Sequence, residues 1–258
     1  MTDFEQPWHS PPSELALPSR SIHLWRVSLE QPPGLVHQLA QLLSRDEQER
    51  AEHFRFERDR RRFIVARGTL RTLAGRYLGL EPGRVQFQYG PYGKPCFAHD
   101  PDHHRLRFNL AHSNELAVYA FAGGREVGID VEYLHPMPDA EEIAQRFFSN
   151  HENASFQMLP DNQKLDAFFN CWTRKEAYIK ALGDGLSHPL DQFQVSLIPG
   201  EPARLLKVDD FPEEVERWHM MAFVPAAGYV GALIAEGSDL QVEDWQFVWP
   251  DDFELAKA

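Results

Sequence analysis

The sequence predicts an α+β fold of two similar lobes, and three observations support this prediction. Short stretches that alternate apolar and polar residues, as half-buried strands do, occur in both halves of the chain. Helical stretches stand beside them without the strict strand–helix alternation of a doubly wound sheet. Hairpin-length links join several strands, and Gly123-Gly124 separates two halves that each combine helices with strands. We therefore expect one lobe in residues 1–124 and the other in residues 125–258.

The first half begins with a proline-rich, irregular stretch and then alternates between strand and helix patterns. Ser44, followed three residues later by Glu47, forms a capping-box pattern that opens one helix. Gly79 ends the longest helix of this half. The expected strands are 22–29, 85–89, 106–111 and 116–122, and the other expected helices are 35–43 and 59–78.

The second half carries its strongest signal in the helix expected at 165–182. Glu176 falls inside the apolar arc of this helix, and Lys180 lies at the edge of the arc. Burial of an unpaired carboxylate costs several kcal/mol, so two interpretations stay open: an i,i+4 Glu176–Lys180 ion pair, or a Glu176 that faces a metal ion. The other expected helices are 140–147 and 151–158, and the expected strands are 127–133, 193–197, 204–208, 218–224, 229–235 and 245–248.

The composition is that of a globular protein and sets limits on partners. Hydrophobic residues make up 43% of the 258 residues, and the net charge of −13 argues against general nucleic-acid binding. The segment 45–76 nevertheless holds ten arginines against six acidic residues, which indicates either an anion site or a solvated charged face. No apolar run has the length of a membrane span, and no secretory signal is recognisable. Two cysteines without a disulfide pattern favour a reducing, cytoplasmic setting.

The stretch VGIDVE combines acidic residues with a strand pattern. Asp130 and Glu132 lie two residues apart in the expected strand and therefore project from the same face. Two carboxylates at this spacing repel each other unless a cation lies between them. With Glu176 added from the helix, three carboxylates offer the hard oxygen ligands that Mg²⁺ prefers. A surface pair of acidic residues with no ligand is the alternative.

Three further motifs carry polar residues at turns. FNLAHS ends a strand with His112 and Ser113, a position suited to phosphate contact or to simple turn formation. YGPYGKP presents Lys94 from a tight loop that lacks the GK[ST] spacing of a P-loop. FFSNHE places Glu152 after an apolar helix end, where it is either a general base or a helix-start residue.

Five motifs in this order, GKP, FNLAHS, VGIDVE, FFSNHE and WTRKEAYIKALGDGLSHPL, together resemble those of the 4′-phosphopantetheinyl transferases of the larger, pseudo-dimeric type. The resemblance covers residues 45–197 in round terms. It implies two α+β lobes related by a pseudo-two-fold axis, with coenzyme A between them. The activity it implies is Mg²⁺-dependent transfer of phosphopantetheine from coenzyme A to a serine hydroxyl of an apo carrier protein, with release of 3′,5′-ADP.

The resemblance also assigns roles to individual residues. It places the magnesium ligands on Asp130, Glu132 and Glu176, the general base on Glu152, and a phosphate-contacting lysine on Lys180. Positions near coenzyme A fall on Lys94, His112, Ser113, Arg62, Arg67 and, more faintly, Arg50. The chain departs from the family at Ala111, where members often have serine, and at Phe63, where some have threonine. We therefore expect altered contacts to the 3′-phosphate.

The expected partners are acyl or peptidyl carrier proteins of nonribosomal peptide, polyketide or fatty-acid synthesis. Because the enzyme is itself acidic, we expect docking through a local basic or apolar patch near the loop 134–138 and Phe147-Phe148. The pseudo-symmetry implies a monomer, with neither nucleic acid nor membrane as a partner. Two rival functions use the same residues: a Mg²⁺-dependent nucleotide or coenzyme A phosphohydrolase, and a non-catalytic binder of carrier proteins.

Overall fold

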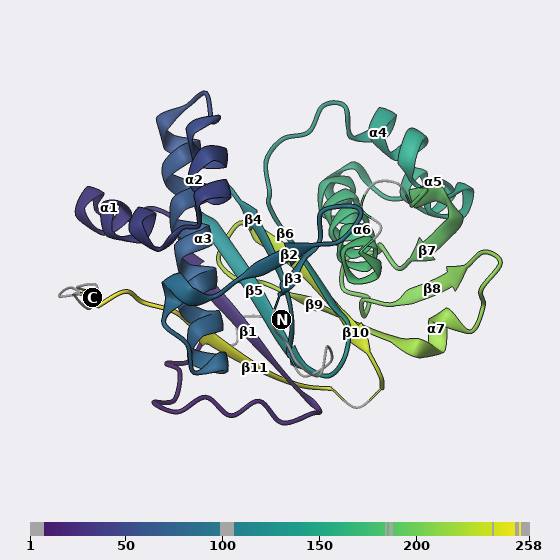
Figure 1. The fold of residues 1–258 in the computed structure, drawn as a ribbon. Helices are drawn as coiled ribbons and strands as arrows, with labels where there is room; N and C mark the ends of the chain where they lie inside the picture. The colour runs from purple at the N-terminus through teal and green to yellow at the C-terminus, as the bar shows by residue number, and fades with distance from the viewer. Residues whose placement is uncertain are drawn as a thin grey trace.

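The computed structural model describes residues 8–98, 106–183, 185, 188–238, 240–250 and 253 of the 258-residue chain. Asp184, Leu186 and Ser187 of the GDGLSHPL motif lie outside the described residues. The molecule is α+β, as the sequence predicts, with two main sheets between two groups of helices (Figure 1). No helix in the described part of the chain has the length and apolarity needed to cross a bilayer.

The first group of helices covers a four-stranded sheet of order β11-β1-β5-β4. The strands of this sheet are β1 (Ser21–Ser28), β4 (Leu106–Ser113), β5 (Leu116–Gly123) and β11 (Gln241–Gln246). The helices are α1 (Pro33–Leu42), α2 (Arg45–Glu52) and α3 (Glu57–Leu78), followed by the 3₁₀ turn η1 (Pro82–Arg84). A separate hairpin pairs β2 (Phe87–Tyr89) with β3 (Pro95–Phe97).

The second group of helices covers a three-stranded antiparallel sheet of order β6-β10-β9. The strands of this sheet are β6 (Val127–Tyr133), β9 (Trp218–Phe223) and β10 (Tyr229–Glu236). A hairpin of β7 (Phe193–Val195) and β8 (Leu205–Val208) lies beside it. The helices are α4 (Ala140–Phe147), α5 (Asn150–Gln157), α6 (Asp161–Leu182), α7 (Glu214–Arg217) and the 3₁₀ turn η3 (Leu190–Gln192).

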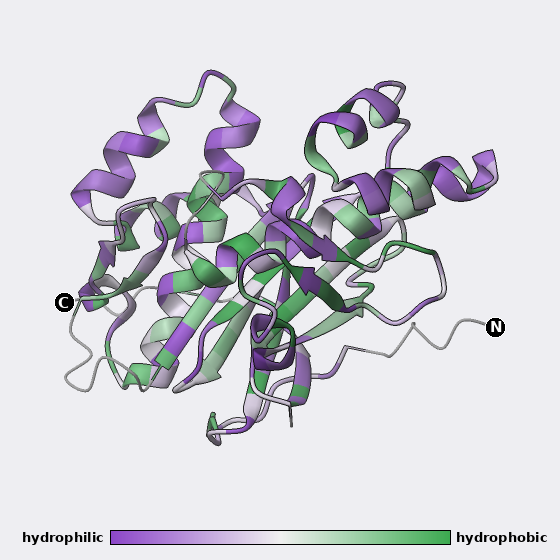
Figure 2. Ribbon diagram, turned by 90° about the vertical axis from the view of Figure 1, so that its right-hand side faces the viewer, coloured by the Kyte–Doolittle hydropathy of each residue, from purple (hydrophilic) through white to green (hydrophobic). Residues whose placement is uncertain are grey.

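The apolar side chains form three clusters that explain the layered arrangement. One cluster fills the space between α1, α3 and the outer face of the first sheet. A second packs α6 against β7, β8 and the second sheet. The third, which includes Val118, Ala120, Ile129 and Leu233, joins the two sheets to each other. The strands are accordingly the apolar interior, and hydrophilic residues concentrate on the peripheral helices (Figure 2).

The structure differs from the sequence-based expectations in four places. Strand β3 and the short helix α7 were not expected, because each has too few residues to show a periodic pattern. Helix α6 begins at Asp161, four residues earlier than expected, since its polar first turn carries no apolar signal. The last strand is β11 at Gln241–Gln246 rather than 245–248, and it pairs in parallel with β1. Residues 125–258 therefore do not all belong to the second lobe.

Candidate functional site

The two faces of strand β6 lie in different environments, one against the first sheet and the other against α6. Val127, Ile129 and Val131 are buried in the apolar cluster between the two sheets. Because side chains alternate along a strand, Gly128, Asp130 and Glu132 face the opposite side, which α6 covers. The sequence expectation that Asp130 and Glu132 share a face agrees with this arrangement.

Gly128 sets how closely α6 approaches β6. A Cβ atom at this position would lie 2.0 Å from the backbone oxygen of Ala177 and 2.5 Å from the backbone nitrogen of Ala181. Only glycine allows the two backbones to come this near. The close approach brings Glu176 and Lys180, on the same stretch of α6, to the acidic face of β6.

Three carboxylates lie near this contact, close enough for the charge of Asp130 to act on the other two. Burial raises the pKa of Asp130 above its ordinary range. Burial, with the nearby charge of Asp130, also raises the pKa of Glu132. For Glu176, burial and the charges of Asp130 and Glu132 raise the pKa to about 7. Burial is the largest cause of all three shifts, and the charge of Asp130 adds to those of Glu132 and Glu176.

Lys180 provides a positive charge close to the three carboxylates. Its Nζ lies 2.6 Å from Oδ1 of Asp130, so it pairs with β6. Burial alone would lower the pKa of Lys180, but Asp130 and the two glutamates raise it on balance. The other oxygen of Asp130, Oδ2, is buried and has no hydrogen-bond partner. Ser113 Oγ donates to Glu132 Oε2 at 2.7 Å.

This donor set fits a hard divalent cation such as Mg²⁺. All three groups are carboxylates, and one buried oxygen, Oδ2 of Asp130, lacks a hydrogen-bond partner. Among the residues that the structure describes, no three His, Cys, Asp or Glu side chains already form a group that could hold a metal ion. Lys180 occupies Oδ1 of Asp130 in this structure.

A cationic group, formed by Arg50, Arg62 and Lys180, lies next to the carboxylates, with the imidazole of His112 beside it. Burial, followed by the nearby charges of Lys180, Arg50 and Arg62, lowers the pKa of His112. These four residues come from α2, α3, β4 and α6, so the site lies where the two lobes meet. Arg62 also pairs with Glu30, at 2.8 Å between Nη2 and Oε1. The arrangement is suited to a polyanionic ligand beside a metal ion.

Asn109 is a contributor that the sequence analysis missed. It is buried on β4, and its Oδ1 accepts a hydrogen bond from the backbone nitrogen of Ile129 at 3.1 Å. This bond fixes the edge strand of the first sheet against the edge strand of the second. The sequence alone gives no signal for this burial, because Asn109 alternates with Arg107 on the polar face of the expected strand 106–111.

Comparisons with known proteins cover both lobes. The family model described as "4'-phosphopantetheinyl transferase, N-terminal" matches residues 24–123, and that of the "4'-phosphopantetheinyl transferase superfamily" matches residues 126–233. The 4′-phosphopantetheinyl transferase HetI of Nostoc sp. is 41% identical over 95% of this chain and 100% of its own length. This chain belongs to the 4′-phosphopantetheinyl transferase family.

Two relatives from Bacillus subtilis extend the comparison. One 4′-phosphopantetheinyl transferase is 34% identical over 67% of this chain and 76% of its own length. The transferase Sfp is 34% identical over 60% of this chain and 66% of its own length. These matches support the resemblance stated from the five motifs, including the larger type of transferase.

Lys94 of the transferase lies at the end of the hairpin β2–β3. Its Nζ donates to Glu126 Oε2 at 2.8 Å and to the backbone oxygen of Ala181 at 2.7 Å. Ala181 is in the last turn of α6, so Lys94 joins the first lobe to the helix that carries Glu176. The structure thus places Lys94 between the lobes, and its contacts among the described residues are to Glu126 and Ala181 rather than to the carboxylate cluster.

Arg67 of the transferase does not join the cationic group. It is buried, and its guanidinium donates to Glu47 and, at 3.0 Å, to Tyr89 Oη. Glu47 also accepts from Arg71 and closes the capping box of α2 through the Ser44 backbone. Burial would raise the pKa of Glu47, but the two arginines lower it on balance. Arg67 therefore has an evident structural partner in the interior of the first lobe.

Glu152 of the transferase is also in the interior. Only 1% of its surface is exposed, and its Oε2 lies 2.8 Å from Lys175 Nζ, a side chain that is itself fully buried. Its Oε1 accepts from the backbone nitrogen of Val195 at 2.7 Å, and Ser149 completes a capping box with it. Both oxygens are engaged, so a general-base role requires this buried pair to open.

Proposed function

We propose that this transferase moves the 4′-phosphopantetheine group of coenzyme A to a serine hydroxyl of an apo carrier protein and releases 3′,5′-ADP. The observation that supports this proposal is the juxtaposition of two oppositely charged groups at the junction of the lobes. One group consists of the carboxylates of Asp130, Glu132 and Glu176, and the other includes Arg50 and Arg62, with the imidazole of His112 beside them. Phosphoryl transfer requires mainly positioning and charge neutralisation, which such an arrangement provides.

The three carboxylates are the proposed ligands of one Mg²⁺ ion. When bound, the ion would neutralise charge on the pyrophosphate and on the leaving phosphate. Asp130, in β6, and Glu176, in α6, are held by the packing of two regular elements, so their relative position is rigid. Lys180, which pairs with Asp130 in this structure, is the proposed contact to a phosphate oxygen of the ligand.

The cationic residues are proposed to bind coenzyme A. Arg62 and His112 face the seam from the first lobe, and Arg50 lies over the ring of Phe63 at 5.5 Å. Phe63 replaces the threonine of some family members, so here an aromatic face supports Arg50 by a cation–π contact. Arg67 and its partner Glu47 would hold α3 in place beneath these residues.

A carrier protein is proposed as the acceptor, and the expected docking patch changes in one respect. Phe148 is buried and cannot contact a partner, whereas Phe147 is half-buried against Trp172. The loop 134–138 after β6 stays part of the proposal. We also propose a monomer in a reducing cytoplasm, where the two thiols of Cys96 and Cys171 stay free.

The test is mass spectrometry of an apo carrier protein after incubation with coenzyme A, Mg²⁺ and the transferase. We expect the carrier mass to increase by one phosphopantetheine group, and 3′,5′-ADP to appear only when carrier is present. A chelator should abolish both products. Release of 3′,5′-ADP without carrier would instead support a phosphohydrolase, and an unmodified carrier under all conditions would refute the transfer.

A further inference from the structure

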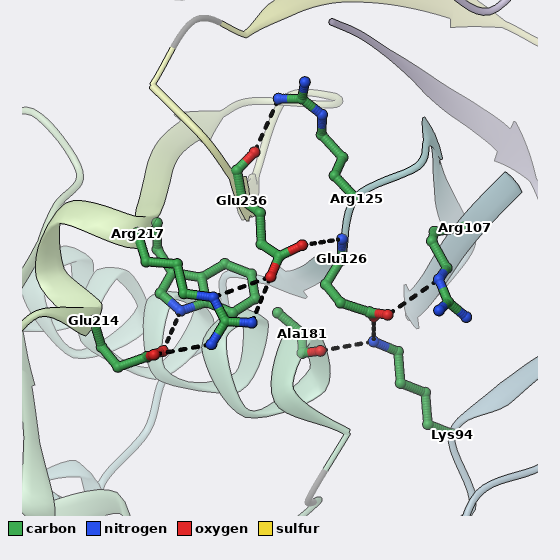
Figure 3. Close-up of polar contacts among 9 residues, drawn as sticks. Lys94, Arg107, Arg125, Glu126, Ala181, Glu214, Arg217 and Glu236 are labelled. Carbon is green, nitrogen blue, oxygen red and sulfur yellow. Dashed lines mark hydrogen bonds and ion pairs between the residues drawn. The ribbon is translucent and has the colours of Figure 1, made fainter. Parts of the chain in front are cut away.

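The ammonium group of Lys94 links the hairpin β2–β3 of the first lobe to the second lobe. The two acceptors of Lys94 Nζ are Glu126, which immediately precedes β6, and the backbone of Ala181 near the end of α6 (Figure 3). An ammonium group has three N–H donors, and its contacts among the described residues use two of them. Lys94 lines a cavity of about 220 Å³ between the hairpin and the C-terminal end of α6.

Glu126 is shared between two cations of the first lobe. Its Oε2 accepts from Lys94, and its Oε1 lies 3.1 Å from Nε of Arg107 on β4. Both cations line the same cavity as Glu126. Without the carboxylate, two positive side chains from neighbouring segments would face the cavity with no anion between them.

A second layer of contacts fixes the position of Glu126. Its backbone nitrogen donates to Glu236 Oε2 at 2.9 Å, and the other oxygen of Glu236 pairs with Arg217 (Figure 3). The backbone oxygen of Glu236 accepts from Arg125 Nη1 at 2.9 Å. Backbone and side chain of Glu126 are thus both anchored, which an isolated surface ion pair is not.

We propose that Glu126 is a positioning residue for coenzyme A binding, because it holds the ammonium group of Lys94 at the lobe junction, where the third N–H of Lys94 can donate to an anionic group of the ligand. This inference rests on the proposed function, in which Lys94 contacts coenzyme A. Glu126 itself touches no ligand and acts through Lys94.

Positioning and plain electrostatics predict opposite effects when the charge of Glu126 is removed. Coenzyme A is an anion, so a nearby carboxylate repels it, and loss of that carboxylate alone would lower the KM for coenzyme A. If Glu126 instead holds Lys94 in place, its loss frees the long lysine side chain and raises the KM. The sign of the change therefore separates the two explanations.

The experiment is steady-state kinetics of Glu126→Gln with coenzyme A varied at saturating carrier protein. We expect the KM for coenzyme A to rise about tenfold, the equivalent of one charge-assisted hydrogen bond, with kcat changed less than twofold. In a Lys94→Ala background the same substitution should add no further increase, because its target is gone. Glu141→Gln is the matched control, because it removes the ion pair of Glu141 in α4 with Lys164 in α6, which are 2.6 Å apart. It should leave the KM for coenzyme A unchanged.

An unchanged or lowered KM in Glu126→Gln would overturn the inference, as would an equal increase in the Lys94→Ala background. Glu126→Asp keeps the charge and should recover part of the loss, and thermal melting of each variant shows whether it is folded. Isothermal titration calorimetry of coenzyme A into each protein, with Mg²⁺ present and carrier protein absent, makes the same comparison between wild type and variants as a Kd. A wild-type protein that binds coenzyme A but labels no carrier would refute the proposed transfer, while the Kd values would still test Glu126.

Discussion

Gly128→Ala tests whether the close approach of α6 to β6 builds the active site. The added Cβ would lie 2.0 Å from the backbone oxygen of Ala177, whereas ordinary contact begins at 3.4 Å, so the helix and strand must separate by about 1.4 Å. The obstacle is backbone, which cannot rotate away as a side chain can. We expect a loss of about 1–3 kcal/mol in the free energy of unfolding. A displacement of this size also predicts a decrease in kcat of about 100-fold.

The assay combines the rate of carrier labelling with urea denaturation of the same preparation. Gly34→Ala is the control, because a Cβ atom there meets nothing within 4 Å and the residue lies inside α1. Alanine should be neutral or stabilise that helix by up to about 1 kcal/mol. Wild-type labelling and stability in Gly128→Ala would refute the argument that this glycine sets the geometry of the site.

Three further predictions address other residues. Glu176→Gln should lower kcat by orders of magnitude without a loss of stability in metal-free buffer, since one of three mutually repelling carboxylates becomes neutral. Glu152→Gln should lower the free energy of unfolding by about 3–5 kcal/mol in denaturant titrations, because it leaves Lys175 buried without its counter-charge. Burial lowers the pKa of His23 from 6.5 to about 4, so wild-type stability should fall by about 3 kcal/mol more than that of His23→Phe as the pH decreases from 6.5 to 4.

The sign of the last prediction follows from proton binding. The unfolded chain protonates this imidazole near pH 6.5 while the folded chain resists protonation, so acid favours the unfolded state. Parallel stability–pH curves for wild type and variant would contradict it. A stable but inactive Glu152→Gln would favour the general-base role instead, and near-normal kcat in Glu176→Gln would remove that residue from the metal site.

The local signals in the sequence predicted most of the fold because each had a direct physical cause. The capping box of Ser44 and Glu47 satisfies backbone donors at the start of α2, and Gly79 ends α3 in the left-handed region. The alternation of VGIDVE placed Asp130 and Glu132 on one face. Such patterns depend on neighbours in the chain alone.

The remaining features depend on partners distant in sequence. The parallel pairing of β11 with β1 brings the C-terminal strand back to the first sheet, and nothing local in Gln241–Gln246 specifies this return. The motifs likewise could not reveal that Arg67 pairs with Glu47, or that Glu126 pairs with both Lys94 and Arg107. These are ion pairs, which any arginine or glutamate can form, and only the fold selects the partner.

Asp130, Glu132 and Glu176 are proposed to hold one divalent ion at the lobe junction. The most direct measurement is electron paramagnetic resonance of Mn²⁺, used as a probe for Mg²⁺, titrated into the protein with coenzyme A present. We expect one bound Mn²⁺ ion per chain in the wild type and none at the same concentrations in Asp130→Asn. Circular dichroism of the variant checks that it is folded. Equal Mn²⁺ binding by the two proteins would contradict this proposal.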